Sequence, residues 1–266
     1  MMALLHVILK GHTDEHNIYL IDEPELFLHP WQTLRSKIDL REKSKTNQVF
    51  IATHSPEFIA KDFDLWKNIY KIYRKDKLTQ CHSIDSDKIT SIFKSAESDY
   101  ELYLIKYCTY LNAENSKLFF CDKVIITEGP TEKCFIEKLY DDGKIVGRDF
   151  YVFSCDSKSN IPHAFQLCQQ LGFNDLEIFI IYDHDKKKGD RQHLEWNSNI
   201  SNLHIQEGNF IAFTDDMEAH FSVPKPPKKQ NHLKPAWFLK HYLNSDMDLE
   251  KRDEFIEKIN IFLKQY

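Results

Sequence analysis

The chain of 266 residues contains only seven glycines, and this scarcity excludes a common nucleotide-binding motif. A phosphate-binding loop of the form GxxxxGK(S/T) holds phosphates with backbone amides that its glycines leave accessible. The single Gly-Lys pair, Gly143-Lys144, is followed by Ile145 and lacks the upstream glycine. An LSGG-like segment is also absent from the sequence. The chain therefore lacks the loop that would bind the phosphates of a nucleotide.

Cysteine pairs and long apolar runs are missing as well. The six cysteines form no CxxC pair, so the sequence indicates neither a zinc site nor a disulfide framework, and we expect reduced thiols in a cytoplasmic protein. No run reaches 18 apolar residues, and the start lacks the basic region and cleavage site of a signal peptide, so no membrane segment is expected. The net charge of −6 confines any DNA-binding surface to a local patch.

The composition, 42% hydrophobic and 29% charged residues, indicates a globular protein of one large or two small domains. Early in the chain, helices are predicted at 3–10 and 30–40, strands at 18–21 and 49–52, and a hairpin in "IYKIYRKD" and "LTQCHSI". From residue 122, apolar runs alternate with helical segments, which predicts βαβ units and a parallel sheet. The predicted strands are 124–126, 151–153, 178–182 and 210–213, and the predicted helices are 131–140, 162–171 and 190–204. Residues 91–118 are predicted to be helical, and the proline- and lysine-rich stretch 223–235 to be an extended loop.

The first acidic pattern lies in "IYLIDEPELFLHP", residues 18–30. Four apolar residues lead directly into Asp22 and Glu23, which is typical of a Walker B strand, and we expect this strand and the one at 49–52 to be buried. In that role Asp22 would hold Mg²⁺ through water, and Glu23 would orient or deprotonate the attacking water. His54 follows a second apolar strand in "IATHSP", from where it could reach a γ-phosphate. The alternative is an acidic strand end and a capped turn in an unrelated fold.

A second acidic pattern follows two of the predicted parallel strands. In "KVIITEGPTEK", Glu128 stands at a strand tip, Gly129 allows a tight turn, and a helix that carries Glu132 follows. In "EIFIIYDHDKK", Asp183 and Asp185 end another strand, and alternation would aim both carboxylates to one side. Repelling carboxylates that converge at one sheet edge predict a hard divalent cation, Mg²⁺ or Mn²⁺, between them. The alternative is a solvated acidic surface.

Both patterns resemble parts of known families. "LIDEPELFLHP" followed by "IATHSP" resembles the ABC-type ATPase heads, and most closely those of the OLD (overcoming lysogenization defect) nuclease family. A glutamate at one strand end and a DxD at a later one resemble the Toprim domain, found in topoisomerases, primases and OLD-family nucleases. This second resemblance covers roughly residues 122–240. In "DSKSNI", residues 156–161, Asp156 and Ser157 replace the glycines of a glycine- and lysine-rich turn that relatives often carry.

The OLD resemblance implies further site residues. In "TDDMEAHF", Asp216 and Glu218 would complete a second metal site. In "NHLKPAWFL", Lys234 takes the place where OLD nucleases keep a late catalytic lysine, which would stabilise charge on the phosphate in the transition state. A solvated lysine or a simple phosphate contact is the alternative. Nearby basic residues would offset the acidic charge and grip DNA phosphates. They are Lys186, Lys187, Lys188, Arg191, Lys225, Lys228 and Lys229.

The organisation that the resemblance implies is an α/β chain of two main parts. Residues 1–90 would be the C-terminal part of an ABC-type ATPase head, and residues 91–121 a helical linker. Residues 122–240 would be a Toprim nuclease domain with a four-stranded, mainly parallel sheet flanked by helices, and residues 241–266 a C-terminal helix. A truncated gene, a split two-chain system and a decayed remnant all fit the missing Walker A motif. ATP binding is therefore expected only with a partner that supplies Walker A.

The implied function is metal-dependent cleavage of DNA, by nicking or double-strand cutting, in defence against phage or other mobile DNA. Glu128, Asp183 and Lys234 would be catalytic, with two Mg²⁺ or Mn²⁺ ions to activate water and stabilise the leaving oxygen. The alternative is a non-catalytic regulatory or assembly subunit of a split ATPase–nuclease complex. A primase or topoisomerase is disfavoured, because no zinc module is present and the chain is too short for strand passage. DNA is the expected partner, and a Walker A-bearing chain or a second copy of this chain are further candidates.

Overall fold

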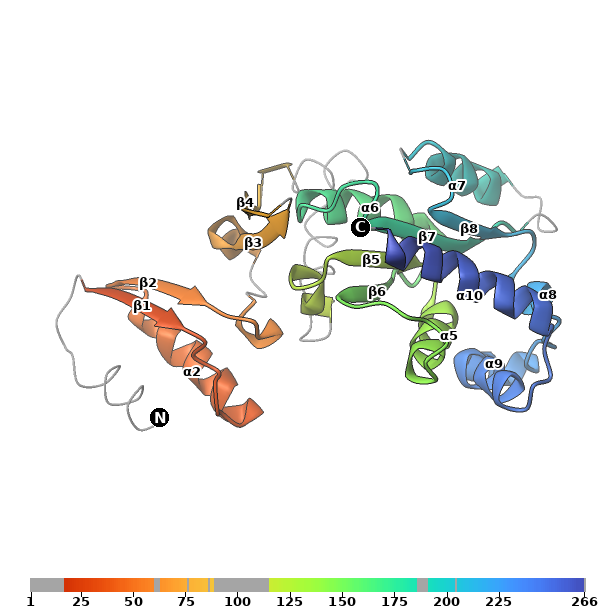
Figure 1. Ribbon diagram of the computed structural model, residues 1–266, viewed down its shortest axis with the longest axis horizontal. Helices are drawn as coiled ribbons and strands as arrows, with labels where there is room; N and C mark the ends of the chain where they lie inside the picture. Colours follow the sequence, from red (N-terminus) through yellow and green to blue (C-terminus); the bar gives the residue numbers. More distant parts are fainter. Residues whose placement is uncertain are drawn as a thin grey trace. The chain divides into compact units, whose positions relative to one another are not determined.

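The computed structural model describes residues 17–59, 63–75, 77–85, 87–88, 115–185, 191–203 and 205–265 (Figure 1). Its contacts divide the chain into two compact units. The first unit comprises residues 1–65 and 105–120, and the second unit comprises residues 66–104 and 121–266. The helices expected over residues 3–10 and most of 91–118 lie outside the described residues.

The first unit contains a parallel pair of strands joined by one helix. β1 (Ile18–Asp22) pairs with β2 (Gln48–Ala52), and α2 (Pro30–Lys43) lies between them in the chain. These three elements confirm the strands and the helix that the sequence predicted. Because the strands are parallel and in register, both end at the same edge. The unit also contains two short 3₁₀ helices, η1 (Pro56–Phe58) and η3 (Asn115–Phe119).

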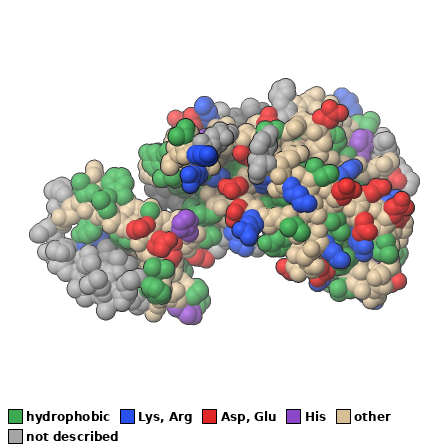
Figure 2. Space-filling model, viewed as in Figure 1, with side chains coloured by type: hydrophobic (Ala, Val, Ile, Leu, Met, Phe, Trp, Pro, Cys, Tyr) green, Lys and Arg blue, Asp and Glu red, His purple; other side chains and the backbone are tan. Residues whose placement is uncertain are grey.

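The expectation that these two strands are buried is wrong. Ile18 and Leu20 on β1 are 64% and 78% exposed, and Phe50 on β2 is 58% exposed. Only alternate residues of β1 are half-buried, so one face of the strand pair is covered and the other is accessible. Figure 2 shows hydrophobic side chains at the surface of this unit. Among the described residues the sheet has only two strands, and a two-stranded sheet buries little apolar surface.

The second unit is built around a four-stranded sheet in which every strand pair is parallel. The strand order β6-β5-β7-β8 confirms the predicted α/β class (Figure 1). The central strands β5 and β7 are buried along their whole length. Strands covered on both faces carry continuous apolar runs, which explains the unbroken runs in the sequence. The bounds are Lys123–Thr127 for β5, Phe150–Ser154 for β6, Ile178–Asp183 for β7 and Phe210–Phe213 for β8.

Helices cover both faces of this sheet. One hydrophobic cluster joins α5, α8, α9 and α10 to alternate strand residues such as Ile125 and Phe179. The strand residues between them are also buried, and α6 contacts β5. The α-helices are α5 (Pro130–Asp141), α6 (Ile161–Gln170), α7 (Arg191–Ser201), α8 (Met217–His220), α9 (Lys234–Leu243) and α10 (Leu249–Lys264). Three 3₁₀ helices, η2 (Phe63–Asn68), η4 (Lys158–Asn160) and η5 (Lys228–Leu233), complete the described elements.

The predicted hairpin is present and packs within the second unit. β3 (Tyr70–Lys75) and β4 (Leu78–Ser83) pair in antiparallel fashion. His82 Nε2 lies 2.8 Å from the last carbonyl oxygen of α6, and Lys71 Nζ donates to the Cys121 carbonyl oxygen at 3.0 Å. These contacts join the hairpin to the unit that carries the parallel sheet, whereas the sequence grouped it with the ATPase-like part. The domain boundaries themselves stay predictions.

The stretch 223–235 is not wholly the extended loop that its prolines predicted. η5 occupies residues 228–233, and α9 begins at Lys234. Pro235 lies in the first turn of α9, where proline is well tolerated because the first amides of a helix have no intrahelical acceptor. The proline therefore marks a helix start, and it places Lys234 on that helix rather than in a basic loop.

Two further properties of the structure concern its cysteines and the apolar character of its helices. The described cysteines carry reduced thiols, and three of them, Cys121, Cys155 and Cys168, are buried. Within the ranges that the structure describes, no helix combines the length and apolar character needed to cross a membrane.

Candidate active site

Five polar side chains from five elements gather beyond the carboxyl ends of the central strands of the second unit. Glu128 follows β5, Asp183 ends β7, and Glu132, Glu218 and Lys234 lie in the first turns of α5, α8 and α9. The charges of the other four residues all act on Asp183, which shows that they lie close to it. Ligand sites of parallel α/β sheets lie at this edge. The structure thus brings together five of the residues that the sequence singled out.

Aromatic side chains hold the three helix starts in position. Each site residue on these helices is followed, three or four positions later, by a phenylalanine on the same face. The three rings contact one another, with centroid separations of 5.6, 5.1 and 5.8 Å. This packing fixes the helix starts, and with them the site residues, relative to one another. The pairs are Glu132 with Phe135, Glu218 with Phe221, and Lys234 with Phe238.

Burial and mutual repulsion raise the pKa of two of the carboxyl groups. Glu132 is 3% exposed, Asp183 7% and Glu218 1%. Burial, reinforced by the charge of Glu128, raises the pKa of Glu132 to about 7. Burial, reinforced by the charges of Glu132 and Glu128, raises the pKa of Asp183 to about 8. Carboxyl groups that titrate near neutrality in one buried cluster are typical of functional sites.

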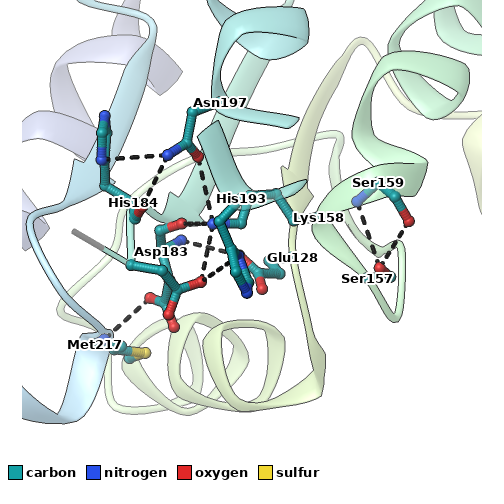
Figure 3. Close-up of polar contacts among 10 residues, drawn as sticks. Glu128, Ser157, Lys158, Ser159, Asp183, His184, His193, Asn197 and Met217 are labelled. Atoms are coloured by element: carbon teal, nitrogen blue, oxygen red, sulfur yellow. Dashed lines mark hydrogen bonds and ion pairs between the residues drawn. The ribbon is translucent and has the colours of Figure 1, made fainter. Parts of the chain in front are cut away.

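Each of three carboxylates accepts a hydrogen bond from a different backbone amide. Glu128 Oε2 accepts the Asp183 N–H at 3.0 Å, and Glu132 Oε2 accepts the Gly129 N–H at 3.2 Å. Asp183 Oδ1 accepts the Met217 N–H at 3.0 Å (Figure 3). Because the carboxylates turn toward separate donors, no three His, Cys, Asp or Glu side chains within the described ranges form a ready set of metal ligands.

The turn between β5 and α5 does not use the conformational freedom of glycine. Gly129 has φ of −145° and ψ of 179°, an extended conformation that any residue adopts. The expected tight glycine turn is therefore absent, and Gly129 contributes through its N–H, which anchors Glu132. A Cβ at this position would lie 3.4 Å from Glu132 Oε2, so a side chain would crowd that carboxylate only slightly.

The burial and the partners of the Glu218 carboxylate show whether the site suits a cation. Both of its carboxylate oxygens are buried, and neither accepts a hydrogen bond from a described residue. Lys234 Nζ lies 3.0 Å from Oε1 and forms an ion pair with it. Burial lowers the pKa of Lys234, but the charge of Glu218 outweighs it and leaves the pKa raised. A buried carboxylate that has a single lysine as its described partner, beside repelling carboxyl groups, fits a divalent cation with oxygen ligands.

Asp216 lies at the start of α8 and already has two partners. Its Oδ1 accepts the Ala219 N–H at 2.8 Å, and Lys225 forms an ion pair with Oδ2. Burial raises the pKa of Asp216, but these donors outweigh it and leave the pKa lowered. Lys225 therefore offsets acidic charge, as the sequence predicted for the basic residues. The others are Lys228, Lys229 and Arg191, which are exposed, and Lys186, Lys187 and Lys188, which lie outside the described residues.

Asp185 has different partners from Asp183. Its carboxylate pairs with Lys158 at 2.9 Å and with His193 at 3.3 Å. The alternation predicted for these two aspartates does not extend to Asp185, because β7 ends at Asp183 and Asp185 is left-handed with φ of +54°. The sequence assigned no role to Lys158, His193 or Asn197. The available indication was the position of Lys158 after β6, at the edge where the other strands end.

In the first unit, Asp22, Glu23 and His54 lie at the ends of β1 and β2, where the sequence placed them. Glu23 Oε1 lies 4.0 Å from His54 Nε2, and the two side chains are 42% and 87% exposed. Glu25, which the sequence did not single out, accepts the Thr53 hydroxyl at 2.6 Å and the His54 N–H at 3.1 Å. This carboxylate joins the segment after β1 to the one after β2. The third acidic residue of "DEPE" was the available indication of such a role.

Two families match different parts of the chain. Residues 119–185, which include β5, β6 and β7, match the family described as "Overcoming lysogenization defect protein-like, TOPRIM domain". Residues 1–60, which include β1 and β2, match the family described as "AAA domain, putative AbiEii toxin, Type IV TA system". Glu128, Glu132 and Asp183 therefore lie within the Toprim match, and Asp22, Glu23 and His54 lie within the AAA match.

Three curated relatives extend these matches. Endonuclease GajA of Bacillus cereus strain VD045 is 31% identical over 135 residues, which is 50% of this chain and 20% of that protein. Endonuclease GajA of Bacillus cereus strain HuB5-5 is 24% identical over 194 residues, 66% of this chain and 28% of that protein. The Old nuclease of Escherichia phage P2 is 25% identical over 163 residues, 59% of this chain and 26% of that protein. The chain thus spans between 20% and 28% of the length of these relatives. The two domain matches and these relatives together support similarity to the OLD family of ATPase–Toprim proteins.

Proposed function

We propose that this chain is a DNA endonuclease of the OLD type that depends on Mg²⁺ or Mn²⁺. The observation that carries the proposal is the cluster of four carboxylates and one lysine at the carboxyl edge of the parallel sheet. Three of the carboxylates, Glu132, Asp183 and Glu218, are less than 10% exposed. Burying so many like charges without a cation is unfavourable, as the raised pKa values of two of them indicate. The names of the relatives, two endonucleases and one nuclease, support the same chemistry.

Glu128, Glu132, Asp183 and Glu218 would hold the divalent cations, with Asp216 as a further ligand. Bound cations supply an activated water and stabilise charge on the phosphate oxygens. The chain contributes rigid placement of its carboxylates, because backbone amides and the aromatic cluster hold them from several elements. In the ionised state, these side chains give the cation oxygen ligands of the kind that Mg²⁺ and Mn²⁺ prefer.

Lys234 would act on the phosphate. Its ammonium lies at the start of α9, paired with Glu218, and its raised pKa keeps it protonated at neutral pH. A fixed positive charge at this place would stabilise the negative charge that develops on the phosphate during cleavage. Lys228 and Lys229, exposed on the preceding η5, would bind phosphates of the DNA strand without taking part in the chemistry.

The proposal extends to biology and to nucleotide use. We place the protein in defence against phage or other mobile DNA, on the basis of its family. We place ATP binding by the first unit in an assembly with a chain that carries Walker A, because the 266 residues contain no GxxxxGK(S/T) segment. Asp22, Glu23 and His54 would then complete the site that the partner begins.

The direct test is cleavage of supercoiled plasmid by the purified chain. With Mg²⁺ or Mn²⁺ we expect conversion to nicked or linear DNA, and with excess chelator we expect none. Metal binding should be measured on the same sample by calorimetry. A chain that binds Mn²⁺ and DNA but never cuts would overturn the endonuclease proposal and favour a regulatory or assembly subunit. A chain that binds no divalent cation would remove the metal site as well.

A further inference from the structure

We propose that Lys158 is a positioning residue of the nuclease site. Its buried ammonium holds the carboxyl end of β7 so that the Asp183 carboxylate faces the other acidic side chains. This inference rests on the proposed function, because it concerns how Asp183 is presented to a divalent cation.

Lys158 is almost completely buried, with 1% of its surface exposed. Its Nζ lies 2.5 Å from the Asp183 carbonyl oxygen, 2.9 Å from Asp185 Oδ2 and 3.3 Å from Asn197 Oδ1 (Figure 3). A lysine ammonium has three protons, and these three acceptors use all of them. The ammonium is therefore fixed in place and is not available to bind a DNA phosphate.

Lys158 and its acceptors come from three separate elements that meet at the site. Lys158 begins η4 after β6, Asp183 ends β7, and Asn197 lies on α7. Asn197 also donates to the His184 carbonyl oxygen at 2.8 Å, so it anchors the residue after Asp183 as well. A buried charge is costly unless it is paired and hydrogen-bonded, and Lys158 meets both conditions only with β7 in this position.

The backbone and side chain of Asp183 are held at three points. Its N–H donates to Glu128 Oε2, its carbonyl oxygen accepts from Lys158, and its Oδ1 accepts from the Met217 N–H. The bonds to Glu128 and Met217 connect Asp183 to other elements of the site. Of the three bonds, the one from Lys158 joins the end of β7 to η4. Loss of Lys158 would leave a buried carbonyl oxygen without this donor and would favour rotation of the peptide that follows Asp183.

The conformation and contacts of Asp185 also support a positioning role for Lys158. Its left-handed conformation, with φ of +54°, is unfavourable for a residue with a side chain. The Lys158 ion pair and a bond from the Asp185 N–H to the Asp215 carbonyl oxygen, at 2.9 Å, hold it there. Strained conformations persist where surrounding contacts determine them, commonly beside functional sites. We therefore assign Asp185 to the support of Asp183 through Lys158.

The experiment measures Mn²⁺ binding by calorimetry on the full 266-residue chain without DNA, so that the readout is separate from cleavage. Lys158→Met keeps the apolar length of the side chain and removes the three donors. We expect it to weaken Mn²⁺ binding by about 10- to 100-fold, the usual effect of losing a group that orients a metal ligand.

Lys123→Met is the matched control. Lys123 is another buried lysine of the same sheet, 8% exposed, whose Nζ donates to the carbonyl oxygens of Phe262 and Gln265 at 2.6 and 2.5 Å. Its contacts lie at the end of α10, so this variant should lower the unfolding temperature without changing Mn²⁺ affinity. If Lys158→Met behaves like Lys123→Met, with lower stability and wild-type affinity, Lys158 is merely structural and the inference is wrong.

A second pair of variants covers the case in which Lys158→Met fails to fold. In Lys158→Met the Asp185 carboxylate would lose its lysine partner. Asp185→Asn removes that negative charge and keeps a side-chain oxygen that can accept from Lys158. Mn²⁺ affinity is then compared between Asp185→Asn and Asp185→Asn with Lys158→Met. A loss of about 10-fold or more in the double variant supports the role of Lys158 through the Asp183 carbonyl. Equal affinities overturn it. A wild-type chain that binds no Mn²⁺ overturns the proposed function, and the inference with it.

Discussion

β1 and β7 are two parallel strands with nearly the same local sequence pattern and very different surroundings. Both consist of apolar residues that end in an aspartate, IYLID in β1 and IFIIYD in β7. β7 lies between two strands and is buried throughout, whereas β1 has one neighbouring strand within the described part of the chain and exposes up to 78% of an apolar side chain. Asp183, at the end of β7, is 7% exposed and surrounded by other carboxylates, while Asp22 at the end of β1 is exposed.

The comparison teaches that an acidic strand end becomes a strongly perturbed site only when the sheet around it desolvates it. In the second unit, helices pack on both faces, and the end of β5 and two helix starts bring three more carboxylates to the same edge. In the first unit, Glu23 and His54 stand at the corresponding edge with side chains 42% and 87% exposed. We therefore expect the second unit to bind metal by itself and the first unit to bind nucleotide only when further chain covers its edge.

The largest expected effect is a difference in plasmid-cleavage rate between variants of Asp183 and of Asp22. Asp183→Ala should reduce plasmid cleavage by at least about 100-fold, because it removes a central cation ligand, and effects of this size follow the loss of one stabilising group. Asp22→Ala should change the rate of the chain alone by less than about threefold, since the nucleotide site is incomplete. Glu257→Ala, on the exposed side of α10, controls for the loss of a carboxylate elsewhere. A wild-type rate for Asp183→Ala would show that the metal site is wrongly assigned.

The next effect separates chemistry from DNA binding within the second unit. Lys234→Ala should lower turnover at saturating DNA by about 100-fold, because its charge acts on the transition state. Replacing Lys225, Lys228 and Lys229 together with alanine should weaken DNA binding and reduce the slope of log affinity against log salt by up to about 3. Steady-state kinetics and binding titrations at several salt concentrations measure both. If Lys234→Ala changes only the affinity for DNA, its catalytic assignment fails.

A third prediction concerns stability and pH, measured by denaturant unfolding with a chelator present. The pKa values of Glu132 and Asp183 are raised in the folded state, to about 7 and about 8, so the folded chain holds these protons more tightly than the unfolded chain. Their stabilising contribution is complete below about pH 4 and is lost as the pH rises through 7 to 8. We expect the free energy of unfolding to fall by several kcal/mol between pH 5 and pH 8.5, on the order of 1.4 kcal/mol for each pH unit over which one group is protonated only in the folded chain.

Two comparisons sharpen this pH prediction. Asp183→Asn should flatten the pH dependence and stabilise the metal-free chain at pH 8.5, because it removes one of the repelling charges. Mn²⁺ should restore stability to the wild-type chain at that pH by binding only the folded state. A pH profile that Asp183→Asn leaves unchanged would show that the loss of stability arises from other groups.

The smallest expected effect is the response of this chain alone to ATP. Most affinity for the phosphates comes from the backbone amides and lysine of a phosphate loop, and none is present in the 266 residues. Calorimetry with ATP and Mg²⁺ should therefore detect no micromolar binding. Micromolar binding by the chain alone would reveal a nucleotide site of another kind. Binding that appears only after a Walker A-bearing chain is added would identify a split ATPase.

Much of the fold could be predicted because the apolar runs and their spacing reflect local requirements. A strand covered on both faces must be apolar throughout, so β5 and β7 are visible in the sequence, and the alternation with helices predicts parallel pairing. The same rule failed for β1 and β2, because an apolar run shows that a strand can be buried and not that the chain provides the cover. The hairpin was visible as two strands, but its packing on α6 depends on contacts between segments far apart in the chain.

The candidate site could likewise be predicted only in part. The sequence alone indicated which carboxylates follow strands, since chemistry and position are both local: Glu128 and Asp183 at strand ends, Glu132 at the next helix start, and Glu218 after the fourth strand. That Glu218 and Lys234 stand at helix starts became clear only from the fold. Only the tertiary structure decided which of them are desolvated, how Asp185 turns away into a left-handed conformation, and that Lys158 is buried against the end of β7. The physical reason is that burial, pKa shifts and hydrogen-bond partners depend on atoms brought together by packing, and no local pattern along the chain contains that information.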